Sequence, residues 1–141
     1  MKVTPKPRAD RQKTNLSGEF FVAAELVKRG LQASLTLGNA KAIDLFAIND
    51  KGSQFTIQVK AVRSRNNDFP IDSTKIAEKC VYVFVVLNKP GVAPEFYVVP
   101  GKDLQSEPGK FGKWFLNYKK FPGINAKDLE AYHDKWQILE V

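Results

Sequence analysis

The clearest pattern in the chain is an alternation of apolar and polar residues, which predicts two neighbouring strands joined by a turn. Residues 54–62 alternate with the period of two that is typical of a half-buried strand. The preceding segment, 42–48, is apolar apart from Asp44. Between them, Asn-Asp-Lys-Gly at 49–52 is a strong signal for a tight turn. Because a polar residue inside an apolar strand is costly without a partner, these strands are expected to carry a site.

A helix is expected over residues 16–29, where apolar residues recur at helical spacing. Ser17 or Asn15 can cap its start, and Gly30 ends it. The expected buried stripe consists of Leu16, Phe20, Ala23, Val27 and Leu31. Glu19 lies beside this stripe in the expected first turn. It either favours the positive end of the helix dipole or points into a polar site at the end of the core.

The rest of the chain contains one segment that is apolar throughout, at 81–87. Such a run is typical of a strand buried on both faces, and Cys80 in front of it is expected to be buried as well. Further strands are expected at 31–37 and 96–99, and further helices at 73–79 and 126–135. The aromatic residues near the C-terminus are expected to be mostly core, and His133 is expected at the surface.

Length and composition predict one globular domain with an anionic partner. The chain has 141 residues, of which 43% are hydrophobic and 26% charged, which argues against general disorder. Its formal net charge is +7, which fits nucleic acid most simply, with an acidic membrane surface or mere solubility as alternatives. The expected organisation is a flexible basic arm at 1–13 and a single domain at 14–141, with a core at about 16–100 and an aromatic, helical extension at 101–141.

The sequence also favours a cytoplasmic protein with no membrane partner. A single cysteine permits no disulfide within the chain, which fits a reducing compartment. No apolar run approaches the length of a membrane span, and the first residues lack the apolar segment of a secretory signal.

The polar residues of the two strands suit metal-dependent phosphodiester hydrolysis. Asp44, the side-chain carbonyl of Gln58 and the main-chain carbonyl of Val59 are hard oxygen donors of the kind that Mg²⁺ prefers. The period of two places Gln58 and Lys60 on one face of the strand. A lysine in this position can orient or deprotonate the attacking water and offset charge that develops on the phosphate.

These residues resemble the motif of the PD-(D/E)XK nuclease superfamily over about residues 16–87. The matching positions are Gly18-Glu19 in the helix, Asp44 in the second strand and Gln58-Val59-Lys60 in the third. The helix-borne glutamate resembles the archaeal Holliday junction resolvase branch. The glutamine in place of the usual acid resembles the Gln-X-Lys form of Mrr-type restriction nucleases. The proline of the superfamily's name is absent, since Ile43 precedes Asp44.

The resemblance implies a restriction endonuclease-like α/β fold, in which helices flank a central mixed sheet with an αβββαβ core. It further implies that Asp44 is the main metal ligand, Gln58 a second ligand, Lys60 the catalytic lysine and Glu19 a further metal or water contact. The implied activity is that of an endonuclease that hydrolyses DNA phosphodiester bonds with Mg²⁺, or with Mn²⁺ as a substitute, in the manner of a resolvase or a restriction enzyme.

Basic residues near the motif are candidates for contacts to duplex or branched DNA. Lys41 precedes Asp44, and Arg63 and Arg65 follow the third strand, where they would neutralise phosphates beside the scissile one. Since cutting both strands needs two sites, a homodimer is a further hypothesis, with the apolar strand and the aromatic C-terminal part as its interface.

Two alternatives stay open. Because the neutral amide of Gln58 binds Mg²⁺ more weakly than a carboxylate, the chain can also be read as a nuclease-fold protein that binds nucleic acid without cutting it. The other alternative is an interaction or accessory module that is basic for reasons unrelated to nucleic acid.

Overall fold

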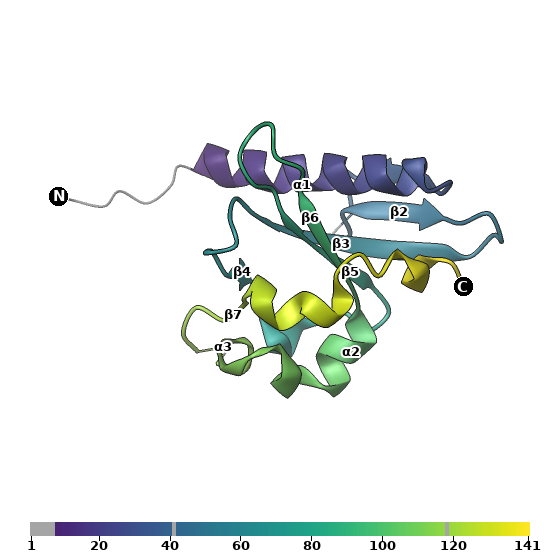
Figure 1. The fold of residues 1–141 in the computed structure, drawn as a ribbon. Helices are drawn as coiled ribbons and strands as arrows, with labels where there is room; N and C mark the ends of the chain where they lie inside the picture. The colour runs from purple at the N-terminus through teal and green to yellow at the C-terminus, as the bar shows by residue number, and fades with distance from the viewer. Residues whose placement is uncertain (1–7, 41, 118) are drawn as a thin grey trace.

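A five-stranded mixed sheet forms the centre of the fold, in the order β1–β2–β3–β5–β6 (Figure 1). The computed structural model describes residues 8–40, 42–117 and 119–141. The strands of the sheet are β1 (Gln32–Leu35), β2 (Leu45–Ile48), β3 (Gln54–Val62), β5 (Val81–Val86) and β6 (Glu95–Pro100). All neighbours pair antiparallel except β3 and β5, which are parallel. The expected α/β class with a mixed central sheet is therefore confirmed.

Two hydrophobic cores lie on the two faces of this sheet. The helix α1 (Arg8–Lys28) packs on the first face, together with η4 (Trp136–Leu139), a short 3-10 helix near the C-terminus. The second face is covered over β5 and β6 by the C-terminal third of the chain, as Figure 1 shows below the sheet. The elements there are α2 (Gly101–Ser106), η2 (Pro108–Phe111), α3 (Lys113–Leu116), β7 (Gly123–Ile124) and η3 (Ala126–Tyr132).

The segment between β3 and β5 contains only one short helical turn. It contains β4 (Phe69–Pro70), which pairs antiparallel with β7, and η1 (Ser73–Lys75), a single 3-10 turn capped by the Asp72 side chain. The helix expected at 73–79 is therefore reduced to this turn. The helix expected at 126–135 is likewise replaced by η3, which ends at Tyr132. Both regions have local turn signals, but neither has enough regular apolar spacing to continue as an α-helix.

The face that α1 turns to the sheet differs from the expected stripe. Leu16, Phe20 and Val27 are 40%, 54% and 57% exposed, so the prediction that they are buried is wrong. The buried row consists of Gly18, Val22 and Leu26, spaced by four residues. Two rows of this helix have helical spacing, and the sheet selects the one with a glycine because α1 lies very close to β3. A Cβ atom at Gly18 would stand 2.7 Å from the Cβ of Ala61.

The helix also begins earlier than expected. It starts at Arg8, so residues 8–13 are helical, whereas the sequence suggested that they belong to a flexible arm. Residues 1–7 of the expected arm lie outside the described residues. As a result Glu19 lies in the middle of α1. The explanation that Glu19 favours the helix dipole from the first turn is therefore excluded, because that effect is confined to the ends of a helix.

The expectations for the core are largely confirmed. Every residue of β5 is buried, as is Cys80. The burial of β5 within one chain leaves this strand unable to form the expected dimer interface. Most C-terminal aromatic residues are core, but Trp114 is 50% and Phe121 100% exposed. Among the described helices, none has the length and apolar composition needed to cross a membrane.

The close approach of α1 to β3 gives a first prediction. Gly18→Ala is expected to destabilise the protein by about 1–3 kcal/mol, because the new methyl group overlaps the side chain of Ala61. In an open helix the same change stabilises by about 0.5–1 kcal/mol, so the sign is diagnostic. Urea denaturation measures the difference. Gly109→Ala, at a position with no atoms within 4 Å, is the control and should be near neutral. A Gly18→Ala variant as stable as wild type would contradict the close packing.

Candidate active site

A pocket of about 440 Å³ brings together all four residues expected to form the site. Glu19 comes from the middle of α1, Asp44 from the residue before β2, and Gln58 and Lys60 from β3. The backbone of Val59, also expected to contribute, lies in the same lining. Residues of the helix α1 and of the β2–β3 hairpin therefore meet where β3 continues beyond the start of β2.

Asp44 is held in place by a backbone group of β3. The last paired residues of β2 and β3 are Leu45 and Ile57. Beyond this pair, Oδ2 of Asp44 accepts a hydrogen bond from the Val59 N–H at 2.7 Å. The carboxylate thus satisfies a main-chain donor that would otherwise be buried without a partner, and its position is set by the sheet. In the described part of the chain, its other oxygen has no hydrogen-bond donor and is available to a ligand.

Two hydrogen bonds from Thr36 hold the turn before Asp44 in place. The buried hydroxyl of Thr36 donates to the carbonyl of Ile43 at 2.7 Å, and the Thr36 N–H donates to the carbonyl of Asp44 at 3.0 Å. These two bonds join Ile43 and Asp44 to Thr36, which follows β1, across the turn at 37–42. Residue 41 of this turn lies outside the described residues. Lys41, a candidate for DNA contact, is one of the residues that the structure does not describe.

Gln58 and Lys60 project from the face of β3 opposite α1. Their partners in the parallel ladder are Tyr82 and Phe84 of β5. Gln58 is buried, with 9% of its surface exposed, and Lys60 is partly buried. Burial lowers the pKa of the Lys60 ammonium group, although the nearby charge of Asp44 opposes this change. A lower pKa makes the ammonium group a better proton donor.

Glu19 faces the site as a second carboxylate. Burial, and then repulsion by the charge of Asp44, raise the pKa of Glu19 from 4.5 to about 7. The charge of Asp44 is therefore close enough to oppose the ionisation of Glu19. Of the two explanations that the sequence left open for Glu19, the structure agrees with a side chain that points into a polar site.

The donor atoms of the pocket fit a hard divalent cation. They are the carboxylates of Asp44 and Glu19, the side-chain oxygen of Gln58 and the carbonyl of Val59, all of them oxygen ligands. In residues 8–40, 42–117 and 119–141, no group of three or more His, Cys, Asp or Glu side chains is placed to hold a metal. Two facing carboxylates supplemented by neutral oxygens suit Mg²⁺, which uses few protein ligands and keeps several waters. A cation would also relieve the repulsion that raises the pKa of Glu19.

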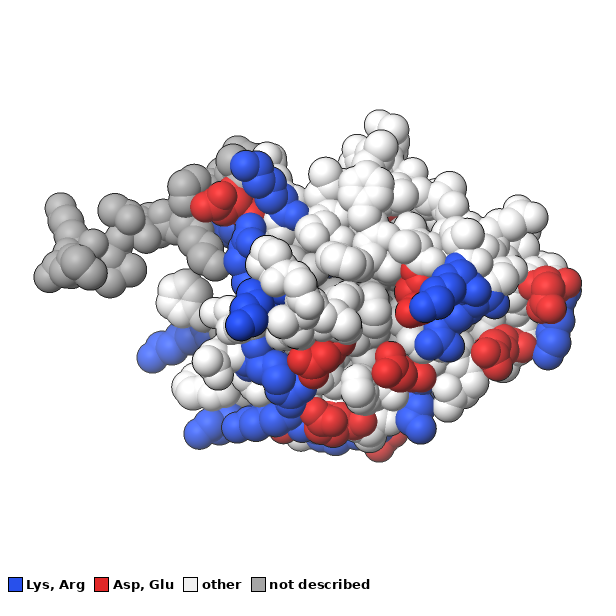
Figure 2. Space-filling model, turned by 45° about the horizontal axis from the view of Figure 1, so that its top comes forward, with Lys and Arg blue, Asp and Glu red and all other residues white. Residues whose placement is uncertain are grey.

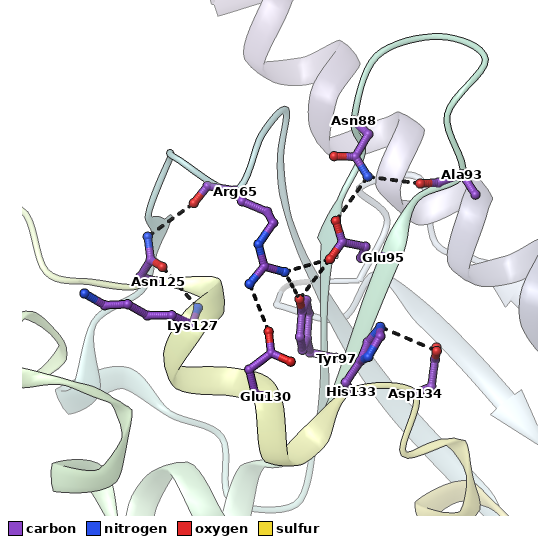
Figure 3. A network of polar contacts seen from close by, with 10 residues as sticks. All are labelled: Arg65, Asn88, Ala93, Glu95, Tyr97, Asn125, Lys127, Glu130, His133 and Asp134. Carbon is purple, nitrogen blue, oxygen red and sulfur yellow. Dashed lines mark hydrogen bonds and ion pairs between the residues drawn. The ribbon is translucent and has the colours of Figure 1, made fainter.

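Arg65 lies in a polar network away from the pocket (Figure 3). Its guanidinium group donates to Glu95 at 2.7 Å, to the Tyr97 hydroxyl at 2.6 Å and to Glu130 at 2.9 Å. It thereby joins β6 to η3. The structure does not bring Arg65 to the candidate site, and its charge is already balanced by two carboxylates. The expectation that it contacts DNA phosphates is therefore not supported by its surroundings.

Arg63 has a different environment. It is exposed and lines a second cavity, of about 240 Å³, together with Arg11, Thr14 and Asn15 of α1. Asn15 also lines the candidate active site, so the two cavities adjoin. Arg11 and Asn15 were not expected to take part in the site. Asn15 precedes Glu19 by four residues and thus lies on the same face of the helix, a signal that was visible only with the correct start of α1.

A scan against protein-family models found no match to this chain, and a search of curated proteins found none either. The candidate site therefore stands on its residues and geometry alone.

The raised pKa of Glu19 gives a second prediction, on stability in metal-free buffer. Between pH 4.5 and about 7 the folded state binds more protons than the unfolded state, so the stability of the wild type falls as the pH rises through this window. Glu19→Gln removes this loss. We expect it to be more stable than wild type by about 1 kcal/mol at pH 8, after allowing for solvent screening, and equally stable at pH 4.

Urea denaturation from pH 4 to pH 8 measures this difference. Glu78→Gln, at an exposed position outside the pocket lining, is the control and should follow the wild-type profile. A gain from Glu19→Gln that is the same at every pH would contradict the assignment.

The network around Arg65 gives a third prediction. Although burial opposes it, hydrogen bonds from Asn88, Arg65 and Tyr97 hold the pKa of Glu95 below its ordinary value. Arg65→Ala is therefore expected to destabilise the protein by about 1–2 kcal/mol at pH 7, and by less below pH 4, where the carboxylates are protonated. Thermal denaturation at the two pH values measures this. Arg63→Ala, the control, should change the melting temperature little, and an equal effect of both changes would refute the structural role of Arg65.

Proposed function

We propose that this protein is a divalent-metal-dependent endonuclease that hydrolyses phosphodiester bonds in DNA. One observation carries the proposal. Glu19, Asp44, Gln58 and Lys60, which lie on three separate elements, line a single pocket with a lysine beside two carboxylates. Phosphodiester hydrolysis needs this combination of groups, because a cation must be held, a water positioned and a developing negative charge stabilised.

The fold is compatible with a restriction endonuclease-like core, which we include in the proposal. A helix is followed by three antiparallel strands, and a crossover then leads to a fourth strand parallel to the third. This order corresponds to the αβββαβ arrangement, with the second helix reduced to η1. The pocket lies where β3 continues beyond its last pairing with β2, at Leu45 and Ile57.

The roles of the residues follow from their surroundings. Asp44, Glu19 and the oxygens of Gln58 and Val59 would hold the cation. Bound there, Mg²⁺ would act as a Lewis acid towards the phosphate and the attacking water. Asp44 is oriented for this task by its bond to the Val59 N–H. Lys60 would hold the attacking water or offset the charge that develops on the phosphate. Gln58 brings no charge, so the negative charge of the site comes from the two carboxylates alone.

Basic side chains near the pocket support a polyanionic substrate. Figure 2 shows Lys and Arg gathered in a column that begins beside the N-terminal end of α1 and continues down the same side of the molecule. Arg11 and Arg63 line the cavity that adjoins the candidate site. They would neutralise phosphates on either side of the scissile one.

A second candidate function is nucleic-acid binding without hydrolysis. It is favoured by the neutral Gln58 and by the lack, within the described residues, of a third acidic group at the site. Both candidates require binding to DNA that weakens steeply with salt, so only the chemistry separates them.

Cleavage of plasmid DNA with Mg²⁺ or Mn²⁺ tests the proposal. Asp44→Asn and Lys60→Met are each expected to slow cleavage by about 10²–10⁴-fold, because each removes a positioned polar group from the reaction. Asp50→Asn in the β2–β3 turn and Lys79→Met before β5 are matched, exposed controls and should retain wild-type rates.

The possible outcomes separate the candidates. Salt-dependent binding without metal-dependent cleavage would favour the second candidate. Cleavage that survives Asp44→Asn would overturn the assigned site. If no DNA binds at low salt, both candidates fail.

A further inference from the structure

A larger cavity, of about 760 Å³, opens directly beside the candidate active site. The linings of the two spaces share four residues, Ala42, Gln58, Lys60 and Pro70. A molecule bound in one space therefore lies next to the other. The volume lies within the range of about 300–1,000 Å³ that is typical of small-molecule sites. The proposed chemistry at the active site leaves this cavity without a role.

The walls of this cavity are apolar and partly aromatic. Ile71 and Ile76 contribute from the segment between β3 and β5, and Tyr82 contributes from β5, next to Gln58. The Tyr82 hydroxyl accepts a hydrogen bond from the Ala77 N–H at 2.9 Å, which holds the ring in place. A flat aromatic group entering from the active site would therefore meet a preformed apolar surface.

Phe121 lies at the edge of the cavity, and packing within the chain does not explain it. Its side chain is 100% exposed, and its φ angle is 43°, a conformation that is unfavourable for a bulky residue. Such local strain persists where the surrounding structure imposes it, and it is concentrated at binding sites. Here the pairing of β4 with β7 and a bond from the Ile71 N–H to the Pro122 carbonyl, at 3.2 Å, hold the backbone next to Phe121.

The charges at the cavity limit what it can accept. Asp68 and Asp72 lie in its lining, with Lys60 and Lys75 as the opposite charges. Asp68 accepts a hydrogen bond from Asn125 at 2.8 Å, and Asp72 accepts two from Thr74, so both carboxylates are held in position. Because these charges balance, the cavity favours a neutral group over a phosphate, and its carboxylates can accept hydrogen bonds from donors on that group. The amino group of adenine or cytosine is such a donor.

We propose that this cavity binds an unpaired nucleobase of the DNA, next to the phosphodiester held at the active site. The inference rests on the proposed function and names its substrate class. A base inside a continuous duplex must be unpaired and unstacked before it can enter a pocket in the protein, whereas a base that is already unpaired enters at little cost. The substrate is therefore DNA with an unpaired nucleotide beside the scissile phosphate. Phe121 stacks on the base, and Tyr82 forms part of the apolar wall.

Binding of the wild-type chain to DNA, measured without metal, tests this inference. Three duplexes of one sequence are compared in EDTA: one continuous, one with a single unpaired deoxyadenosine, and one with an abasic nucleotide at the unpaired position. The unpaired deoxyadenosine is expected to tighten binding about tenfold or more over the continuous duplex, and the abasic nucleotide to abolish most of this gain. The abasic duplex separates recognition of the base from recognition of a kinked backbone.

Variants at Phe121 assign the effect to the cavity. Phe121→Ala is expected to bind the deoxyadenosine and abasic duplexes equally, whereas Phe121→Trp keeps the preference for the base. Phe20→Ala is the matched control, since Phe20 is an aromatic residue on α1 that is 54% exposed and outside the cavity lining. It should retain the wild-type preference.

Equal binding of the wild type to the deoxyadenosine and abasic duplexes would overturn the inference. The proposed nuclease activity would survive that result if metal-dependent cleavage is found. Failure to bind any of the three duplexes at low salt would overturn the proposed function and this inference with it.

Discussion

The hydrogen bond between Asp44 and the Val59 N–H is the contact on which the candidate site depends. It stands just beyond the last paired residues of β2 and β3, where a buried main-chain donor needs an acceptor. The Asp44 carboxylate is this acceptor. One side chain therefore satisfies the main-chain donor of β3 and places a negative charge next to it. That charge then acts on its neighbours, since it opposes ionisation of Glu19 and attracts the ammonium group of Lys60. The same side chain, Asp44, therefore contributes to the hydrogen bonding of the sheet and to the electrostatics of the pocket.

The parts of the fold that were predictable from the sequence are those set by local periodicity. The alternation in β3, the turn before it and the apolar run of β5 all have signals within a few residues, and they placed Gln58 and Lys60 correctly on one face. The face of α1 was not predictable in this way. Two rows of that helix have helical spacing, and the choice between them depends on how closely the helix approaches Ala61, which lies more than forty positions further along the chain.

Contacts between distant segments account for the other differences. Arg65 follows β3 closely in the sequence, where the sequence suggested a phosphate ligand, but its partners Glu95 and Glu130 lie 30 and 65 residues further on. Phe121 looked like one more core aromatic residue, and its exposure follows from the pairing of two-residue strands that have no pattern of their own. In both cases the sequence shows the type of the residue but not its position in the fold, because that position is decided by contacts between segments that are distant in the sequence.

The protonation of Glu19 has a consequence for how the site would be loaded. With a pKa of about 7, this carboxyl group carries a proton for much of the time near neutral pH in the absence of a cation. If a divalent ion binds to Glu19 as proposed, it must displace that proton, so the metal ion and the proton compete for the same carboxylate. The occupancy of the pocket then depends on the ratio of metal to hydrogen ions in the surroundings. Acidification would therefore weaken the binding of such a cation through Glu19 alone, with no change in the fold required.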